Sequence, residues 1–416
     1  AAKPSRSLAN WDVDISHLQH PYLPDSIQIS IPKRYEVGVA LGAGAFGVVC
    51  SATDTSNGTS VAIKKISDPF EQPKQAKCFL REIVYQSRLV HFNILKGNAI
   101  WLGLDDALYV SMDNMETDLG WVIKSEQPLS AEHVKYFVYQ IAVALQYLHA
   151  ANVVHRDIKP SNCLVAANCD LKLCDFGMCR VIDQEPKQQK DPVSEYVVTR
   201  WYRAPEIIFC SSYDHKVDVW SLGCIMAQLI QRKPLFTGRS TRDQIQQITA
   251  ITGVPPHFLE AAPIPFGARQ FLRKTLAENP APAEVSWEAH IKVPSSYGES
   301  LDHSAACVLD AALQFDCKKR ATASSLLAQD FFAPLRGASG LERLPQTTLN
   351  SQWEQHLDFR NKSALRRVVE QEMDRLNVQK TPKTVRRVVS LDEIAESMQR
   401  KNALLPSSAQ DVRWDD

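Results

Sequence analysis

The stretch VVHRDIKPSNCL, residues 153–164, places three polar side chains of different chemistry in one short segment. Asp157 offers a carboxylate that can accept the proton of a hydroxyl group, and Asn162 offers an amide oxygen that can bind Mg²⁺. Lys159 supplies a cation suited to a phosphate in transfer. This combination predicts phosphoryl transfer, with Asp157 and Lys159 as catalytic residues and Asn162 as a metal ligand. A His-Arg-Asp run also occurs in ordinary turns, so the prediction needs support from other segments.

A second candidate metal ligand follows in the stretch CDFG, residues 174–177. The carboxylate of Asp175 can bind Mg²⁺ that bridges the phosphates of a nucleotide. Asn162 and Asp175 are therefore the predicted metal ligands, and ATP and Mg²⁺ are the predicted cofactors.

Upstream, three glycines form a G-x-G-x-x-G pattern between two β-like runs. A dinucleotide-binding loop would instead join a strand to a helix, so we expect a hairpin that covers phosphates. Backbone amides approach phosphate oxygens closely only where side chains are absent. The ATP-binding residues predicted on this hairpin are Leu41, Gly42, Ala43, Gly44, Ala45, Phe46, Gly47, Val48 and Val49.

Lys64 ends the strand-like run VAIK, and Glu82 lies in the helical stretch FLREI. A lone lysine in a strand is usually just solvated. A half-buried lysine needs an anion, however, and a glutamate on a facing helix supplies one. The pair would hold Lys64 toward the α- and β-phosphates of a nucleotide, so both residues join the predicted catalytic set.

The elements that must position these residues fall into two predicted lobes, which gives an α+β fold class. Residues 1–34 are polar and are predicted to form an extended N-terminal segment. Residues 35–113 are β-branched runs with one helix, and residues 116–335 are mainly helical, with Ser130 as an N-cap. Residues 336–416 form a tail that is partly helical by pattern.

The composition excludes some classes of partner. The 416 residues contain 47 Lys+Arg and 47 Asp+Glu, so net charge suggests no bulk attraction to nucleic acid or to a membrane. The longest apolar run is too short to cross a bilayer, and the first residues lack an apolar signal core. The cysteines show no metal-binding spacing and read as reduced core thiols. We therefore expect a cytoplasmic and/or nuclear protein.

Five motifs stand in one order: the glycine loop, VAIK, HRDIKPSN, DFG and APE. In this the chain resembles the eukaryotic protein kinases over about residues 35–335. The resemblance implies a bilobal fold with ATP in the cleft between the lobes. It also implies that Met112 is the gatekeeper and that the hinge from Asp113 to Met115 contacts adenine. Lys159, placed two residues after the catalytic Asp157, resembles the serine/threonine kinases.

The stretches YVVTRWYRAPE and METDL resemble the mitogen-activated protein kinases. In that family a Thr-x-Tyr lip is phosphorylated by an upstream dual-specificity kinase, and the matching residues here are Ser194 and Tyr196. A phosphate adds charge that can order a loop where arginines receive it. The resemblance implies such arginines for both sites: Arg81, Arg156 and Arg180 for Ser194, and Arg200 and Arg203 for Tyr196. It also pairs Glu206 with Arg320 as a structural contact.

Three further stretches, GAFGVVCSATD, PLSAEHVKYFVYQIAVALQYLH and KKRATASSLLAQDFF, resemble the Nemo-like kinases. Tyr196 departs from that branch, which carries Thr-x-Glu at this lip. The family implies protein substrates with Ser-Pro or Thr-Pro sites, and no pattern indicates an oligomeric state.

Two alternatives to an active mitogen-activated kinase stay open. A catalytically weak scaffold would be expected to lack one of the motif residues, yet all are present: Lys64, Glu82, Asp157, Asn162 and Asp175. A cyclin-dependent kinase would share the proline preference, but its cyclin-binding helix motif is not visible in KQAKCFLREIVYQSRL.

The tail contains two amphipathic patterns. One begins at Ser363 as N-cap, and the other begins at Ser390 with a capping box. Apolar helix faces need something to cover them, and the simplest expectation is docking on the back of the large lobe. The alternative is a regulatory tail, because Thr381-Pro382 and Ser390 lie in a stretch typical of phosphorylation sites.

Overall fold

The computed structural model describes most of the chain. The described residues are 13–18, 27–44, 47–103, 106–182, 200–209, 213–255, 259, 264–278, 285–298, 300–337, 341–346 and 348–378. They form two compact units. Unit 1 takes its described residues from Ala1–Met115, Asp175–Met178 and Gln352–Arg386, and unit 2 takes them from Glu116–Cys174 and Cys179–Ser351.

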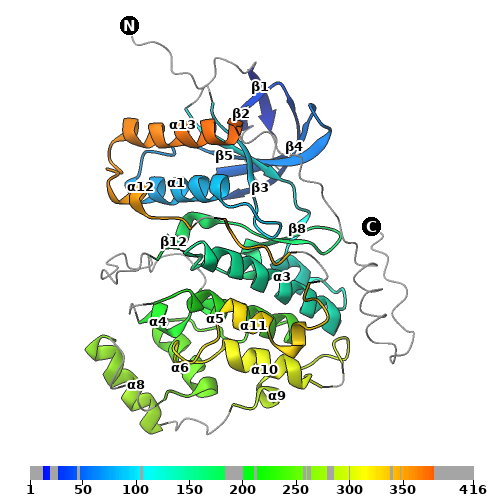
Figure 1. Cartoon of the computed structure of the whole chain (residues 1–416), viewed down its shortest axis with the longest axis vertical. Helices are drawn as coiled ribbons and strands as arrows, with labels where there is room; N and C mark the ends of the chain where they lie inside the picture. The colour runs from blue at the N-terminus through cyan, green and yellow to red at the C-terminus, as the bar shows by residue number, and fades with distance from the viewer. Residues whose placement is uncertain are drawn as a thin grey trace. The chain divides into compact units, whose positions relative to one another are not determined.

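Unit 1 is built on a five-stranded antiparallel sheet in the order β3-β4-β5-β7-β6 (Figure 1). The strands are β3 (Tyr35–Gly44), β4 (Gly47–Asp54), β5 (Thr59–Ile66), β6 (Gly97–Leu102) and β7 (Leu108–Asp113). Their β-branched and aromatic residues favour the pleated conformation. Trp101 stacks between Tyr35 and Tyr109, with ring centroids 5.6 and 5.5 Å away, and this ladder is part of the core of unit 1.

The glycine-rich stretch is the hairpin between β3 and β4, as the pattern predicted. Gly42 lies opposite Val49, and Gly44 lies opposite Gly47. Gly47 has φ of +123°, and a Cβ placed there would lie 1.9 Å from the carbonyl oxygen of Lys65. The position therefore requires glycine.

Residues 1–34 hold more structure than the extended N-terminal segment expected from the sequence. Strands β1 (Val13–Leu18) and β2 (Ile27–Pro32) form an antiparallel pair. The tyrosine hydroxyl of Tyr109 accepts from the backbone N–H of Ser30 at 3.0 Å, and Trp101 Nε1 donates to the carbonyl of Ser30 at the same distance. The sequence does not show this contact, because the side chains that bind the Ser30 backbone come from the distant strands β6 and β7.

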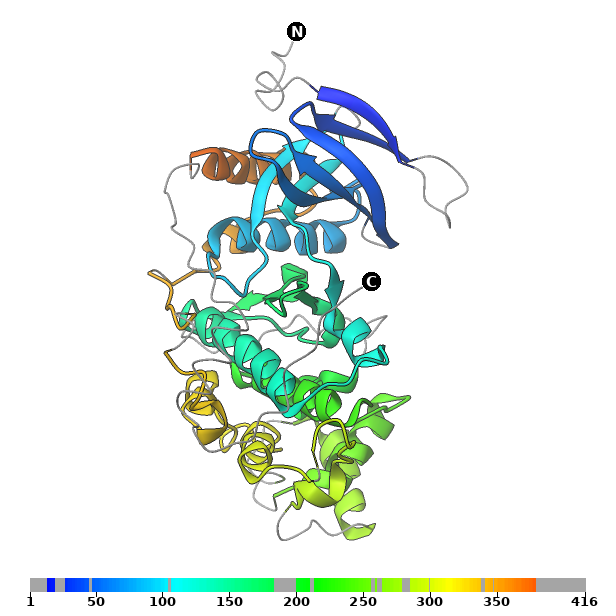
Figure 2. The same ribbon diagram turned by 90° about the vertical axis from the view of Figure 1, so that its right-hand side faces the viewer.

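Helix α1 (Pro73–Arg88) and the tail belong to the same unit. Helix α13 (Lys362–Val378) packs on α1 and on β6, and the views show α1 and α13 side by side (Figures 1 and 2). The short helix α12 (Gln352–Gln355) precedes it. Docking of α13 on the large lobe was therefore a wrong expectation, because its apolar face is covered within unit 1.

The start of α13 also differs from the prediction. The side-chain oxygen of Asn361 accepts the backbone N–H of Ala364 at 3.1 Å, so Asn361 is the N-cap and Ser363 lies inside the first turn. The second predicted tail helix, from Ser390, lies outside the described residues, as does Thr381-Pro382.

Unit 2 is mainly helical. Its helices are α2 (Leu119–Lys124), α3 (Ala131–Ala150), α4 (Pro205–Ile208), α5 (Lys216–Gln231), α6 (Thr241–Thr252), α8 (Phe266–Glu278), α9 (Trp287–His290), α10 (His303–Ala312) and α11 (Ala323–Leu327). Helices α3 and α5 pack together at its centre, and Trp220 and Leu148 are completely buried there. Ser130 is the N-cap of α3, as predicted, and it also forms a capping box with His133. Across the described residues we find no helix with the length and apolarity that a membrane crossing requires.

Short strands and 3-10 turns carry the polar loops of unit 2. They are β8 (Thr117–Asp118), β9 (Val153–Val154), β10 (Cys163–Val165), β11 (Leu171–Leu173) and β12 (Arg180–Val181), with the turns η1 (Pro160–Asn162), η3 (Arg200–Tyr202) and η4 (Asp330–Phe332). The turn η2 (Phe176–Met178) belongs to unit 1. The pair β9–β12 and the sheet β11-β10-β8 flank residues 155–162, so the loop with Asp157 is fixed at both ends.

Candidate active site

Asp157, Lys159 and Asn162 converge in unit 2. Lys159 Nζ donates to Asp157 Oδ2 at 2.7 Å, and Asn162 Nδ2 donates to the same oxygen at 3.0 Å and to the Asp157 carbonyl at 2.8 Å. Asp157 is only 8% exposed. The carboxylate is therefore oriented by two donors and keeps a second oxygen, Oδ1, that can accept a proton from a substrate hydroxyl.

A residue that the sequence did not single out holds this loop. The carboxylate of Asp218, on α5, accepts the backbone N–H groups of His155 and Arg156, both at 2.8 Å. Arg156 has φ of 67°, a left-handed conformation that is costly for a side chain larger than glycine. The two hydrogen bonds keep the backbone in that conformation and so aim the next residue, Asp157.

The charge of Asp218 is itself stabilised inside the protein. His149 Nε2 lies 3.0 Å from Asp218 Oδ2, and the Asp218 side chain is fully buried. Burial raises the pKa of the Asp218 carboxyl, but the hydrogen bond from His149 and the charges of His149 and His155 outweigh it, so the pKa lies below its ordinary value. The available signal was an acidic residue inside the apolar run VDVWSLG, residues 217–223.

Lys64 and Glu82 form the predicted ion pair in unit 1. Lys64 Nζ lies 2.7 and 2.9 Å from the two carboxylate oxygens of Glu82. Strand β5 carries Lys64 opposite Val49 of the glycine hairpin, and helix α1 carries Glu82. The lysine is thus placed beside the hairpin expected to cover phosphates.

Asp175 also belongs to unit 1, at the start of the segment that packs on α1. It has φ of 63°, and the next two residues, Phe176 and Gly177, are buried. A Cβ on Gly177 would lie 3.4 Å from the side chain and the carbonyl of Cys78 on α1. The small glycine therefore permits a close approach between this segment and α1.

The other predicted nucleotide residues lie on the hairpin and at the end of β7. Leu41 is 48% exposed, an apolar side chain open to solvent on the hairpin, and Met112 is 7% exposed opposite Ala62 and Gly97. Asp113 ends β7, and Met115 ends the first segment of unit 1. Ala45 and Phe46 lie outside the described residues, and so does the side chain of Ala43.

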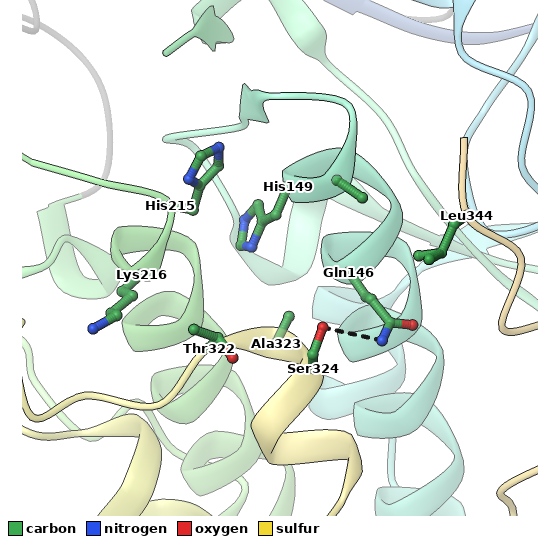
Figure 3. Close-up of a pocket in the computed structure, with 9 residues that line it drawn as sticks. Gln146, His149, His215, Lys216, Thr322, Ala323, Ser324 and Leu344 are labelled. Carbon is green, nitrogen blue, oxygen red and sulfur yellow. Dashed lines mark hydrogen bonds between the residues drawn. The ribbon is translucent and has the colours of Figure 1, made fainter. Parts of the chain in front are cut away.

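Unit 2 contains a pocket that no sequence motif predicted. Its cavity measures about 330 Å³ and includes His149 and His215, whose rings lie 5.0 Å apart (Figure 3). Gln146 donates to Ser324 across it at 3.1 Å. Burial, followed by the charge of His149, lowers the pKa of His215. The pocket shares His149 with the Asp218 contact that holds the catalytic loop.

Comparison with known proteins places this geometry in a family. The protein kinase domain family matches residues 35–332. Similar proteins include extracellular signal-regulated kinase 1 of Dictyostelium discoideum, 38% identical over 81% of this chain and 61% of its own length. Mitogen-activated protein kinase 1 of Oryza sativa subsp. japonica is 39% identical, with 76% of each chain covered. Mitogen-activated protein kinase HOG1 of Cryphonectria parasitica is 40% identical over 73% of this chain and 80% of its own.

The chain belongs to the mitogen-activated protein kinases. Both the family match and identities of 37–46% support this. This makes it a serine/threonine protein kinase by family, with the predicted α+β fold of a β-sheet lobe and a helical lobe. The resemblance to the Nemo-like branch stays a prediction.

Protein kinases use ATP and Mg²⁺, and the residues of this kinase fit that use. The amide nitrogen of Asn162 donates its hydrogen bonds to Asp157. Within the described chain the amide oxygen of Asn162 accepts no hydrogen bond. That oxygen and the carboxylate of Asp175 are hard ligands of the kind that Mg²⁺ prefers. Asn162 of unit 2 and Asp175 of unit 1 stay the predicted metal ligands, and Lys64 stays the residue predicted to hold nucleotide phosphates. When bound, Mg²⁺–ATP supplies the phosphoryl group and neutralises its charge.

The residues expected to receive phosphates are placed as follows. Arg156 Nη1 donates to the hydroxyl of Tyr213 at 2.8 Å, and Arg200 Nη1 donates to the carbonyl of Arg239 at 3.1 Å. Arg180 lies in β12, and Arg203 follows η3. Ser194 and Tyr196 lie outside the described residues. Their arginine partners therefore stay predictions.

Arg81 has a partner that the sequence did not suggest. Its guanidinium binds the carboxylate of Glu354 from the tail, with Arg81 Nε 3.0 Å from Glu354 Oε2. The predicted structural pair is confirmed: Arg320 Nη1 and Nη2 lie 2.5 and 3.0 Å from the two oxygens of Glu206.

Proposed function

We propose that this kinase transfers the γ-phosphoryl group of ATP to serine or threonine followed by proline in protein substrates. The observation that supports phosphoryl transfer is the orientation of the Asp157 carboxylate, which accepts hydrogen bonds from Lys159 and Asn162. The Lys64–Glu82 pair adds the phosphate-binding lysine. A scaffold without activity is disfavoured because all of these contacts are formed.

The proline preference rests on family membership. Mitogen-activated kinases disfavour an acceptor whose following residue has a free backbone N–H, and the matching segment here runs from Val197 to Arg203. Residues 200–203 of it are described, and residues 197–199 are not. The relatives found by comparison carry the names of mitogen-activated kinases, which favours this type over a cyclin-dependent kinase.

The preference is tested with two peptides that differ only in the residue after the acceptor, Pro or Ala. We expect kcat/KM at least about 10-fold higher for the Pro peptide, a difference of about 1.4 kcal/mol in transition-state binding. The same two peptides are also made with Thr in place of Ser as the acceptor, which controls for the type of acceptor hydroxyl. Equal transfer to the Pro and Ala peptides would overturn the proposed specificity and leave the kinase assignment intact.

We further propose that an upstream dual-specificity kinase activates the enzyme by phosphorylating Ser194 and Tyr196, and that the protein works in the cytoplasm and/or nucleus. Buried cysteines such as Cys163 and Cys224 remain thiols, which suits a reducing compartment. Added phosphates order a loop when arginines bind them, and both phosphates would act on one loop.

Ser194→Ala and Tyr196→Phe are each expected to lower turnover severalfold, and the double variant should add little to the worse single one. Ser300→Ala, at an exposed serine of unit 2, is the control and should leave turnover unchanged. Intact-mass spectrometry with phosphosite mapping follows the phosphates while ATP consumption is measured. Full activity of the unphosphorylated protein would contradict the switch.

A further inference from the structure

The turn η3 is held in unit 2 by polar side chains of two helices. The hydroxyl of Tyr202 donates to Gln228 Oε1 at 2.5 Å, and the hydroxyl of Ser221 donates to the Tyr202 carbonyl at 2.7 Å. Both partners lie on α5. From α6, Gln244 Nε2 donates to the carbonyl of Trp201 at 3.3 Å. Three side chains therefore fix the path of the backbone through this turn.

These contacts lie where water does not compete for them. The residues that form them are at most 8% exposed: Tyr202, Ser221, Gln228 and Gln244. Burial raises the pKa of the Tyr202 hydroxyl, so this group keeps its proton and acts as the donor. A buried polar group that loses its partner carries the full cost of its desolvation. The turn therefore has one strongly preferred position against α5 and α6.

Helix α5 also holds the catalytic loop. Asp218 binds the backbone N–H groups of His155 and Arg156. It lies one turn before Ser221 on the same helix, and side chains three positions apart share one face of a helix. One helix therefore positions both the loop that carries Asp157 and the turn η3. A shift of η3 on α5 would change the place of the turn relative to the catalytic carboxylate.

We propose that Gln228 is a positioning residue for the choice of substrate, acting through Tyr202 to fix η3 relative to Asp157. The turn lies in the segment 197–203 that family membership assigns to the residue after the acceptor, and residues 200–203 of it are described. Proline carries a rigid ring, so its fit depends on a contact surface of fixed shape. This inference rests on the proposed proline preference and names a residue that maintains it.

Gln228→Leu removes the acceptor at similar volume and leaves the Tyr202 hydroxyl buried without its partner. We expect kcat/KM for the Pro peptide to fall about 10-fold, since a misplacement of about 1 Å can cost about 10²-fold. Alanine has no ring to misplace, so kcat/KM for the Ala peptide should fall less than about 3-fold and the Pro-to-Ala ratio should fall at least about 3-fold. The KM for ATP should not change.

The control is Gln246→Leu, which makes the same change at an exposed glutamine of α6. It should leave kcat/KM for both peptides within about 2-fold of wild type. If Gln228 only stabilised the fold, its variant would lower the melting temperature and would lower kcat/KM for the two peptides by the same factor. Phosphorylation states are matched by intact mass, so a failure of the activation proposal does not affect the ratio.

A double-variant cycle tests the path through Tyr202. Tyr202→Phe keeps the ring and removes the donor, so it should lower the Pro-to-Ala ratio by itself. In that background Gln228→Leu has no hydroxyl left to release, and it should change the ratio less than about 2-fold further. If Gln228→Leu does not fold, the ratio of Tyr202→Phe decides, with a fall of about 3-fold expected.

The wild-type ratio separates this inference from the proposed function. A wild-type preference for proline that stays unchanged in Gln228→Leu, or in Tyr202→Phe where that variant decides, would overturn the role of Gln228 alone. A full additive loss in the Tyr202→Phe background would also overturn it, because the path would then not run through the tyrosine. Equal transfer to both peptides by the wild-type enzyme would overturn the proline preference and this inference with it.

Discussion

Asp157→Asn is expected to abolish most phosphoryl transfer while the protein keeps its fold and its nucleotide affinity. Asparagine has the shape of aspartate and can still accept from Lys159 and Asn162, which lie 2.7 and 3.0 Å from Asp157 Oδ2. It cannot take the proton of a substrate hydroxyl, and general-base catalysis is worth about 10²–10⁴-fold. We expect kcat to fall by that factor, measured as ADP release with a saturating protein substrate.

The matched control is Asp310→Asn, an exposed aspartate of α10 in the same unit. It makes the same chemical change far along the chain from the loop and should leave kcat within about 2-fold of wild type, because exposed substitutions of this kind have small effects. The affinity for a fluorescent ATP analogue checks that the nucleotide still binds to Asp157→Asn. Near-normal turnover by this variant would remove Asp157 from the role of base.

The parts of the site that the sequence predicts are those set by local geometry. The glycines between two β-like runs form the hairpin β3–β4, because only glycine fits at Gly47 against the Lys65 carbonyl. Asp157 and Asn162 meet because a short 3-10 turn joins them. Lys64 and Glu82 were predicted as a pair from the need of a half-buried lysine for an anion.

The parts that the sequence does not predict depend on contacts between distant segments. Nothing near Arg81 marks Glu354 as its partner, since a surface glutamate in the tail usually stays solvated. The apolar stripe of α13 shows that something covers it, but does not choose between β6 with α1 and the large lobe. Asp218 is a similar case, because a buried acid requires partners and the sequence does not say that they are the backbone amides of His155 and Arg156.

Glu206→Gln is expected to lower the stability of unit 2 more than any surface change. The side chains of Arg320 and Glu206 are 0% and 4% exposed, and the guanidinium also donates to the carbonyls of Gln314 and Lys216. Burying two charges is costly, and their mutual attraction repays that cost only while both are present. Without the carboxylate charge, the cation of Arg320 stays buried and uncompensated, a loss of about 3–5 kcal/mol.

At about 2–4 °C per kcal/mol for a unit of this size, this loss lowers the melting temperature by about 6–20 °C. Scanning calorimetry measures the change, with Glu132→Gln as the control. Glu132 pairs with Lys135 at 3.3 Å, but its side chain is 60% exposed, so its variant should shift stability by less than about 0.5 kcal/mol. The two variants remove the same charge from a glutamate, so the difference between them isolates burial. Equal melting temperatures would mean that the guanidinium of Arg320 finds compensation among its backbone carbonyls and over the ring of Trp220, 5.1 Å away. The ion pair would then contribute little to the stability of unit 2.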